Sequence, residues 1–422
     1  MDVEAKNTQS GLRKEFSWIL FGNLYYAATQ YLLLLGITRF SAPETLGIFS
    51  LALAINAPVS LFFSLGLRAV IISDTKNSYS NSTYMTLRVL SSVLSVLVAL
   101  AIICVAGYSS EIAIPIFFIA GAKACDSVSD LIYGIFQKQA KNEQIAVSMA
   151  IRGTLSCFFA AAILFRIKSL NAMCGAIFLA SVMVLAFYDT PRTRGVSAAP
   201  KWKLPSGSLK LLILLSLPLA FATVLSSLEL NIPRYLIEHR IGLAALGVFS
   251  ALSYPLMLGN QIVGALASAA SPKLAEYFHD FHLTEFKSLI RRLAGAGAVV
   301  GFLSALVCCL FGRPILSLLK HTEYTENARA FGILAIAAGF SYITVFFGAG
   351  LSAMKCFRAK LFLQCASFAV VTFFAVLAST KLTVIAMSMA ILFGSIFALI
   401  SQWAVFVVKL RSARLSSARE AA

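Results

Sequence analysis

The sequence predicts an all-α polytopic membrane protein, with about 12 transmembrane helices forming two parallel six-helix lobes around a central cavity. Three observations carry this prediction. The 422 residues are 59% hydrophobic and only 13% charged, with a mean hydropathy of +0.84. Apolar runs long enough to cross a bilayer recur from residue 16 to residue 408. A short motif also recurs at the same place in each half of the chain, which indicates internal duplication.

The apolar runs define the expected helices in chain order. A helix of about 20 residues spans a hydrocarbon core of about 30 Å. The twelve predicted spans are 16–38, 45–67, 87–107, 111–137, 144–165, 169–188, 209–231, 243–268, 293–311, 328–351, 360–380 and 383–408.

The basic residues between these spans predict the orientation of the chain. With the N-terminus in the cytoplasm, the cytoplasmic connections and termini hold 24 Lys and Arg residues and the external connections hold 9. Cytoplasmic segments carry the excess of Lys and Arg in membrane proteins. We therefore expect both termini to be cytoplasmic.

The repeat and the longest polar connection predict the domain organisation. The motif at residues 46–50, LGIFS, recurs as LGVFS at residues 246–250, each at the start of a span. Six spans separate the copies, and an even number makes the halves parallel. Between the halves lies a basic segment rich in Pro, Gly and Ser, typical of a linker that contacts anionic lipid. The predicted parts are a lobe at 1–188, a linker at 189–208, a lobe at 209–408 and a basic tail at 409–422.

The fourth predicted span contains three charged residues, Lys123, Asp126 and Asp130. At about 100° per residue they project from one face of the helix. A charge near the bilayer centre costs about 2.5–3.5 kcal/mol, so it faces a bundle interior or a watery cavity. Two readings stay open: an internal ion pair between Lys123 and Asp126 that helps the bundle to pack, or a cavity wall that contacts substrate or a coupling cation.

Two more polar residues lie inside spans. Arg152 on the fifth span is at about the depth of Asp130, so an ion pair between them is geometrically plausible. If that pair does not occupy it, Arg152 is an anion contact, because its planar fork suits phosphate oxygens. Asn56 precedes Pro58 near mid-membrane, and we expect it to line the cavity.

Several function classes find no support. The net charge of +17 is spread over loops, and no basic domain is present to bind nucleic acid. The eight cysteines lie in or beside apolar runs without a CxxC motif, so neither disulfides nor metal are expected. No phosphate-binding loop or hydrolase motif occurs, which argues against an enzyme and against a cofactor.

Residues 271–292 show helical apolar spacing and predict a separate cytoplasmic amphipathic helix.

Three stretches carry a family resemblance. Residues 22–74, residues 130–156 and the segment SPKLAEYF at 271–278 resemble Wzx-type O-antigen and polysaccharide repeat-unit flippases. These belong to the multidrug/oligosaccharidyl-lipid/polysaccharide exporter (MOP) superfamily. The resemblance implies a bacterial inner-membrane protein that flips undecaprenyl-diphosphate-linked oligosaccharide, for O-antigen (lipopolysaccharide), capsule or exopolysaccharide synthesis. It also implies alternating access, with a polysaccharide polymerase as a candidate partner.

The resemblance suggests roles for individual residues. A diphosphate headgroup needs a wet, cationic passage, for which Arg39, Arg68, Lys123 and Arg152 are the best placed positive charges, with Asn56 beside them. Arg68 and Asp74 belong to the stretch that resembles the family pattern at the cytoplasmic mouth. Asp126 and Asp130 are candidates to take up H⁺ or Na⁺.

Two other functions remain in contention. A cation-coupled drug or metabolite antiporter of the same superfamily would use Asp126 and Asp130 to bind a positively charged substrate. A scaffold for polysaccharide-assembly enzymes would need neither Lys123 nor Arg152. A monomer is the expected oligomeric state.

Overall fold

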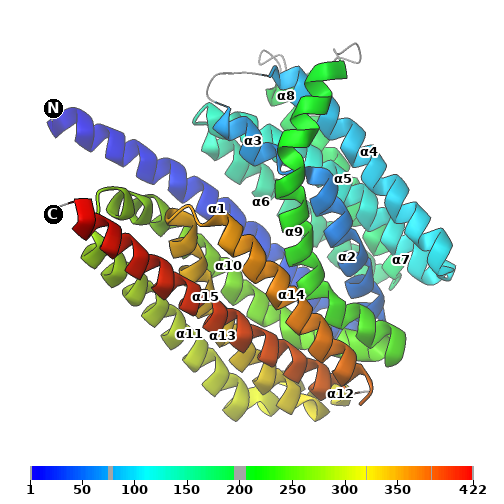
Figure 1. Ribbon diagram of the computed structural model, residues 1–422. Coiled ribbons are helices and arrows are strands. Elements are labelled where there is room, and N and C mark those ends of the chain that lie inside the picture. The colour runs from blue at the N-terminus through cyan, green and yellow to red at the C-terminus, as the bar shows by residue number, and fades with distance from the viewer. Residues whose placement is uncertain (1, 75–78, 194–205, 320, 382, 421–422) are drawn as a thin grey trace. The chain divides into compact units, whose positions relative to one another are not determined.

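The computed structural model describes residues 2–74, 79–193, 206–319, 321–381 and 383–420. Every regular element in these ranges is a helix (Figure 1), which confirms the predicted all-α membrane class. Ten helices of the described residues are long and apolar enough to cross a membrane. They correspond to ten of the predicted spans. The other two predicted spans, 16–38 and 209–231, fall within the long helices α1 and α9.

The described residues form two compact units, each with its own core. Unit 1 comprises Met1–Ser41 and Ile48–Ser227. Within it α1 packs against α6, α4 against α5, and α7 against both α5 and α6. Its helices, the last of which continues beyond the unit, are α1 (Asp2–Phe40), α2 (Pro43–Ser64), α3 (Leu67–Ser73), α4 (Asn81–Ala106), α5 (Ser110–Lys138), α6 (Asn142–Arg166), α7 (Leu170–Val184), the π-helix η1 (Leu185–Asp189), α8 (Thr190–Arg192) and α9 (Ser206–Arg240).

Short breaks in unit 1 set the directions of its helices. Gly66 adopts a left-handed conformation (φ 56°) and separates α2 from α3, as a residue without Cβ does readily. At the start of α4 the Ser80 hydroxyl accepts a hydrogen bond from the Thr83 amide, an N-cap. The apolar core on this side of the unit is formed by α3, α4, the second half of α5, the start of α6 and the first half of α9.

Unit 2 comprises Ala42–Gly47 and Leu228–Ala422. Its central helix is α13, which packs against α10, α11 and α15, while α14 packs against α15 (Figure 1). Small residues on α13 allow this close packing: a Cβ on Gly301 of α11 would lie 2.5 Å from the Cα of Gly339. Besides the end of α9, the helices are α10 (Leu243–His279), α11 (Leu283–Ser317), α12 (Thr322–Glu326), α13 (Ala328–Ala353), α14 (Phe357–Ser379) and α15 (Val384–Glu420).

The two copies of the repeated motif make the closest backbone approach in unit 2. A Cβ on Gly47 would lie 1.9 Å from the carbonyl oxygen of Leu243, and a Cβ on Gly247 would lie 1.8 Å from that of Pro43. No side chain fits at these distances. The motif therefore requires glycine because the starts of α2 and α10 cross in contact.

The expectation of a separate amphipathic helix over residues 271–292 is wrong. Helix α10 continues to His279 and α11 begins at Leu283, so only a three-residue turn separates two long helices. Phe281 in this turn has a positive φ of 58°. The apolar spacing instead reflects burial of Leu274, Phe286 and Ile290 in the core of unit 2.

Candidate functional site

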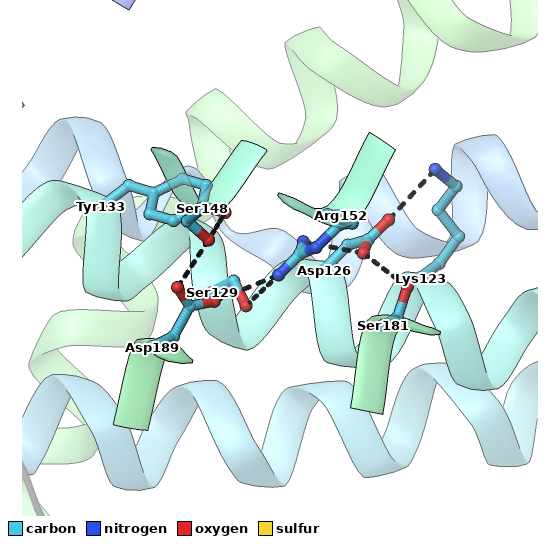
Figure 2. Close-up of polar contacts among 8 residues, drawn as sticks. All are labelled: Lys123, Asp126, Ser129, Tyr133, Ser148, Arg152, Ser181 and Asp189. Atoms are coloured by element: carbon cyan, nitrogen blue, oxygen red, sulfur yellow. Dashed lines mark hydrogen bonds and ion pairs between the residues drawn. The ribbon is translucent and has the colours of Figure 1, made fainter. Parts of the chain in front are cut away.

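A chain of polar side chains crosses the interior of unit 1 (Figure 2). It consists of Lys123, Asp126, Ser129 and Tyr133 from α5, Ser148 and Arg152 from α6, Ser181 from α7 and Asp189 from η1. Positions three, four and seven apart share one face of a helix, so α5 presents its four members on one side and α6 its two. The end of α7 widens into the π-helix η1, a feature that often marks functional sites.

Arg152 is the centre of this network. Its side chain is 5% exposed and lies between two carboxylates: Nη1 is 2.8 Å from Asp126 Oδ1, and Nη2 is 3.1 Å from Asp189 Oδ2. Nη2 also donates to the Ser129 hydroxyl. Two negative charges surround one positive charge here, and the fully buried Asp189 depends on Arg152 for its charge balance.

Hydroxyl groups and one lysine complete the network. Ser148 donates to Asp189 Oδ1 at 2.6 Å, and Tyr133 lies 2.7 Å from Ser148. Ser181 donates to Asp126 Oδ1 at 3.1 Å. At the exposed end of the network, Lys123 Nζ lies 3.4 Å from Asp126 Oδ2, and the lysine side chain is 37% exposed. The two cations, Lys123 and Arg152, balance the two carboxylates, Asp126 and Asp189, so the network is neutral in sum. The network thus runs from a buried carboxylate to a partly exposed ammonium.

A second charged cluster surrounds Asp130. Arg68 from α3 places Nη1 3.0 Å from Asp130 Oδ1 and donates through Nη2 to Gln137 at 3.1 Å. Arg88 from α4 is fully buried, lies 3.9 Å from Asp130 Oδ2 and donates to Ser64 O and Ser127 Oγ. Two guanidinium groups share one carboxylate, so this cluster carries one net positive charge. Arg68 and Asp130 are 28% and 41% exposed.

The structure corrects the predicted partners of the charged residues. Asp130 does not pair with Arg152; it pairs with Arg68 and Arg88, while Arg152 pairs with Asp126 and Asp189. The predicted Lys123–Asp126 pair is present, but as one end of a longer network. Helical spacing places side chains on a face correctly but does not say which neighbouring helix that face meets.

Three further predicted site residues lie outside both clusters. Asn56 is 2% exposed and donates to Ala52 O and to Ile116 O on α5, so it joins two helices. Asp74 ends α3, accepts hydrogen bonds from the Tyr79 amide and the Tyr84 hydroxyl, and its carbonyl accepts one from Lys138. Arg39 is exposed in the last turn of α1.

Sequence reasoning missed Arg88 and Asp189. Arg88 lies at the very start of the predicted span 87–107 and Asp189 is the first residue of the predicted linker, so neither is expected among the charges inside the membrane. A signal was available for Asp189, since it follows the apolar run LAFY without a break and so extends the helix. For Arg88, helix α4 begins at Asn81, and all its residues from Ser82 to Arg88 are buried. Because this helix begins with polar residues, its sequence does not indicate that they are buried.

Comparison with known proteins identifies the family. A family model described as "Polysaccharide biosynthesis protein" matches residues 12–278. The chain belongs to this polysaccharide biosynthesis protein family. It is also 29% identical over 348 residues to the "Capsular polysaccharide biosynthesis protein CapF" of Staphylococcus aureus, covering 80% of this chain and 86% of that protein. These findings confirm the resemblance to Wzx-type polysaccharide flippases.

The fold of this family member is that of MOP-superfamily transporters. An inward-facing multidrug resistance MATE transporter of that superfamily has a TM-score of 0.76 at 13% identity, covering 94% of this chain and 96% of that one. A MOP-superfamily transporter from Pyrococcus furiosus gives 0.65 at 13% identity, covering 95% and 96%. The Vibrio cholerae MATE transporter VcmN in its bent form gives 0.64 at 16% identity, covering 97% and 99%.

Proposed function

We propose that this protein flips undecaprenyl-diphosphate-linked oligosaccharide repeat units from the cytoplasmic to the periplasmic leaflet of the bacterial inner membrane. Polysaccharide-related transport follows from the family match and the similarity to CapF. The proposal adds the substrate, the direction and alternating access as the mechanism. The headgroup of such a substrate carries a diphosphate, which a protein binds through cationic side chains with several donors.

The single observation that carries the proposal is the unequal charge of the Asp130 cluster. Two arginines share one carboxylate, and Arg68 is partly exposed. An incoming diphosphate can replace the carboxylate as the partner of Arg68 without leaving Asp130 alone, because Arg88 stays beside it. Lys123 offers a second exposed cation at the end of the Arg152 network. We assign Arg68 and Lys123 to the substrate.

Arg152 has a different role in this proposal. Its donors bind Asp126, Asp189 and Ser129, and its side chain is 5% exposed, so it holds Asp126 in place and does not touch the substrate. Asp126 and Asp130 are the groups through which H⁺ or Na⁺ would reset the transporter. Binding of either ion at Asp126 would weaken its contact with Lys123 and so change the charge presented to substrate.

A cation-coupled antiporter is the second candidate, because Asp130 is the most exposed carboxylate of the two clusters, at 41%. Two guanidinium groups beside that carboxylate repel a cationic substrate, however, and so favour the flippase. The variant Asp126→Asn/Asp130→Asn separates the two functions. Drug efflux by an antiporter should be abolished, whereas a flippase retains partial export.

The test is restoration of surface glycan in a flippase-deleted bacterium whose glycan matches this protein. The wild type is compared with Arg68→Ala, Lys123→Ala and the control Lys141→Ala, which removes an exposed lysine at the start of α6. We expect export by the wild type and the control and its loss in the other two at equal protein levels. Full export by Lys123→Ala and Arg68→Ala would overturn the site, and normal drug efflux without glycan export would overturn the function.

A further inference from the structure

Unit 2 contains a partly open cavity of about 160 Å³ that belongs to neither cluster of unit 1. Its walls come from α9, α10, α13, α14 and α15, and apolar side chains form most of them. The polar residues that line it are Glu229, Arg234, Ser253, Asn260, Ser341 and Ser395. A largely apolar cavity lined by two charged side chains needs a physical explanation, because a charge in apolar surroundings is costly.

Arg234 lines this cavity and has no counter-ion among the residues that the structure describes. Its side chain is buried, and no carboxylate oxygen of the described residues lies within 4.0 Å of it. Nη1 donates to the carbonyl of Leu230 and to Asn231, and Nη2 lies 3.7 Å from the Met257 sulfur. Its Nε is buried and makes no hydrogen bond. A guanidinium carries five donor hydrogens, so Arg234 retains donor capacity for a ligand.

Glu229 lines the same cavity and accepts a hydrogen bond from a neutral amide. Gln364 donates to its Oε2, and no cation of the described residues lies within 4.0 Å. Glu229 and Arg234 are five positions apart on α9, which places the two side chains about 140° apart around the helix. They therefore cannot pair directly, although both line one cavity. A single ligand can contact both.

The size and chemistry of the cavity define that ligand. A cavity of roughly 150 Å³ holds a molecule of benzene, so this one accommodates the carboxylate and the adjoining ring atoms of a sugar acid, while the rest of the ring extends through the open side of the cavity. The fork of Arg234 matches a carboxylate, while the carboxylate of Glu229 and the amide of Asn260 suit hydroxyl groups. Apolar residues such as Phe249, Leu256 and Leu334 supply walls for the C–H faces of a sugar ring.

We propose that this cavity binds one acidic pyranose residue, with its carboxylate on Arg234 and its hydroxyl groups toward Glu229. The assignment rests on the proposed function for its setting, in which an oligosaccharide passes through the protein. It adds a sugar-selective site in unit 2, separate from the diphosphate contacts assigned in unit 1. It also limits the favoured cargo to repeat units that contain a carboxylated sugar.

The first test uses purified full-length protein in detergent and measures its melting temperature. Sodium glucuronate is compared with glucose, and with sodium chloride and sodium phosphate at equal ionic strength. We expect a rise of about 2–4 °C with glucuronate and little change with the others, since a ligand that binds only the folded state stabilises it. An equal rise with glucose, or with phosphate, or no rise with glucuronate would overturn the proposal.

Variants locate the binding. Arg234→Gln should lose the response to glucuronate, and Arg234→Lys should weaken it because an ammonium lacks the planar fork. The control Arg329→Gln removes an exposed arginine at the start of α13 and should respond like the wild type. Arg234→Lys keeps the charge and so remains informative if Arg234→Gln does not fold. An unchanged response in Arg234→Lys and Arg234→Gln would overturn the site.

A second test separates this inference from the proposed function. Export is measured in two flippase-deleted strains, one whose repeat unit contains an acidic sugar and one whose repeat unit is neutral. Selective loss of the acidic glycan in Arg234→Gln supports the inference. Equal export of both by the variant overturns it while the flippase function stands. Failure of the wild type in both strains counts against the flippase function, and the binding assay then decides the sugar site by itself.

Discussion

The two compact units contain buried arginines in opposite electrostatic states. In unit 1 Arg152 lies between the carboxylates of Asp126 and Asp189, with distances of 2.8 and 3.1 Å. In unit 2 Arg234 is equally buried, but its contacts among the described residues are a carbonyl, an amide side chain, a sulfur and the ring of Tyr254, with no carboxylate. A paired charge holds helices together, whereas an unpaired charge costs stability that a ligand can restore. Arg152 is therefore the arginine for which we expect a structural role, and recognition of a ligand is the role that we propose for Arg234.

The largest expected effect is on the paired arginine. Arg152→Met leaves two carboxylates, one of them fully buried, without a cation. Breaking a buried ion pair from one side costs about 3–5 kcal/mol, and we expect the free energy of unfolding to fall by about that amount. Denaturant or thermal unfolding in detergent measures it.

A further change to the same network provides the control. Adding Asp126→Asn and Asp189→Asn to Arg152→Met removes the stranded charges, so part of the lost stability should return. A melting temperature for Arg152→Met equal to that of the wild type would show that the network is not structural and would remove the basis of the comparison.

The second effect concerns packing in unit 2, where the backbones at the starts of α2 and α10 are in close contact. Gly247→Ala places a Cβ 1.8 Å from the carbonyl oxygen of Pro43, so the helices must separate. Overpacking of this kind costs about 1–3 kcal/mol. The matched control is Gly295→Ala, an exposed helical glycine with no atom within 4 Å of the new methyl, and it should be neutral or slightly stabilising. Equal melting temperatures for both variants would contradict the close crossing.

The third effect separates stability from transport. Lys123 is 37% exposed, so its ion pair with Asp126 contributes at most about 1 kcal/mol, and Lys123→Ala should unfold almost like the wild type. Its glycan export should nevertheless be lost, because we assign this cation to the substrate. Surface glycan at matched protein levels measures the loss. A large fall in stability with normal export would instead place Lys123 with Arg152 as a structural residue.

The smallest effect on stability is expected at the unpaired arginine. Arg234→Met removes a buried cation that no carboxylate balances, so the free energy of unfolding should stay the same or rise by about 1 kcal/mol. The change is thus opposite in sign to that of Arg152→Met. Unfolding of both variants side by side tests it. A loss for Arg234→Met as large as that for Arg152→Met would mean that Arg234 is structural.

Local patterns were sufficient for much of the fold. Apolar runs of the right length predicted ten of the helices that the described residues form, because hydrophobic length depends on neighbouring residues alone. Spacing along α5 placed Lys123 and Asp126 within reach of each other for the same reason. The repeated LGIFS and LGVFS motifs marked positions where glycine proves indispensable, although only the structure shows the backbone contact that requires it.

The partners of the charged residues needed the tertiary structure. Asp126 and Asp130 lie one turn apart on α5, yet one faces Arg152 on α6 and the other faces Arg68 and Arg88 on α3 and α4. Which helix covers each side of α5 depends on the packing of many side chains far apart in the sequence. The same holds for Arg234, whose place beside a cavity depends on five helices.

The sequence by itself thus determined a helical, multi-pass membrane protein of a polysaccharide biosynthesis family, because apolar length and motif similarity are properties of short segments. Only the tertiary structure decided which buried charges are neutralised and which remain available to a ligand. The physical reason is that an ion pair needs its two groups within about 4 Å, and in a helical bundle that distance is set by long-range packing.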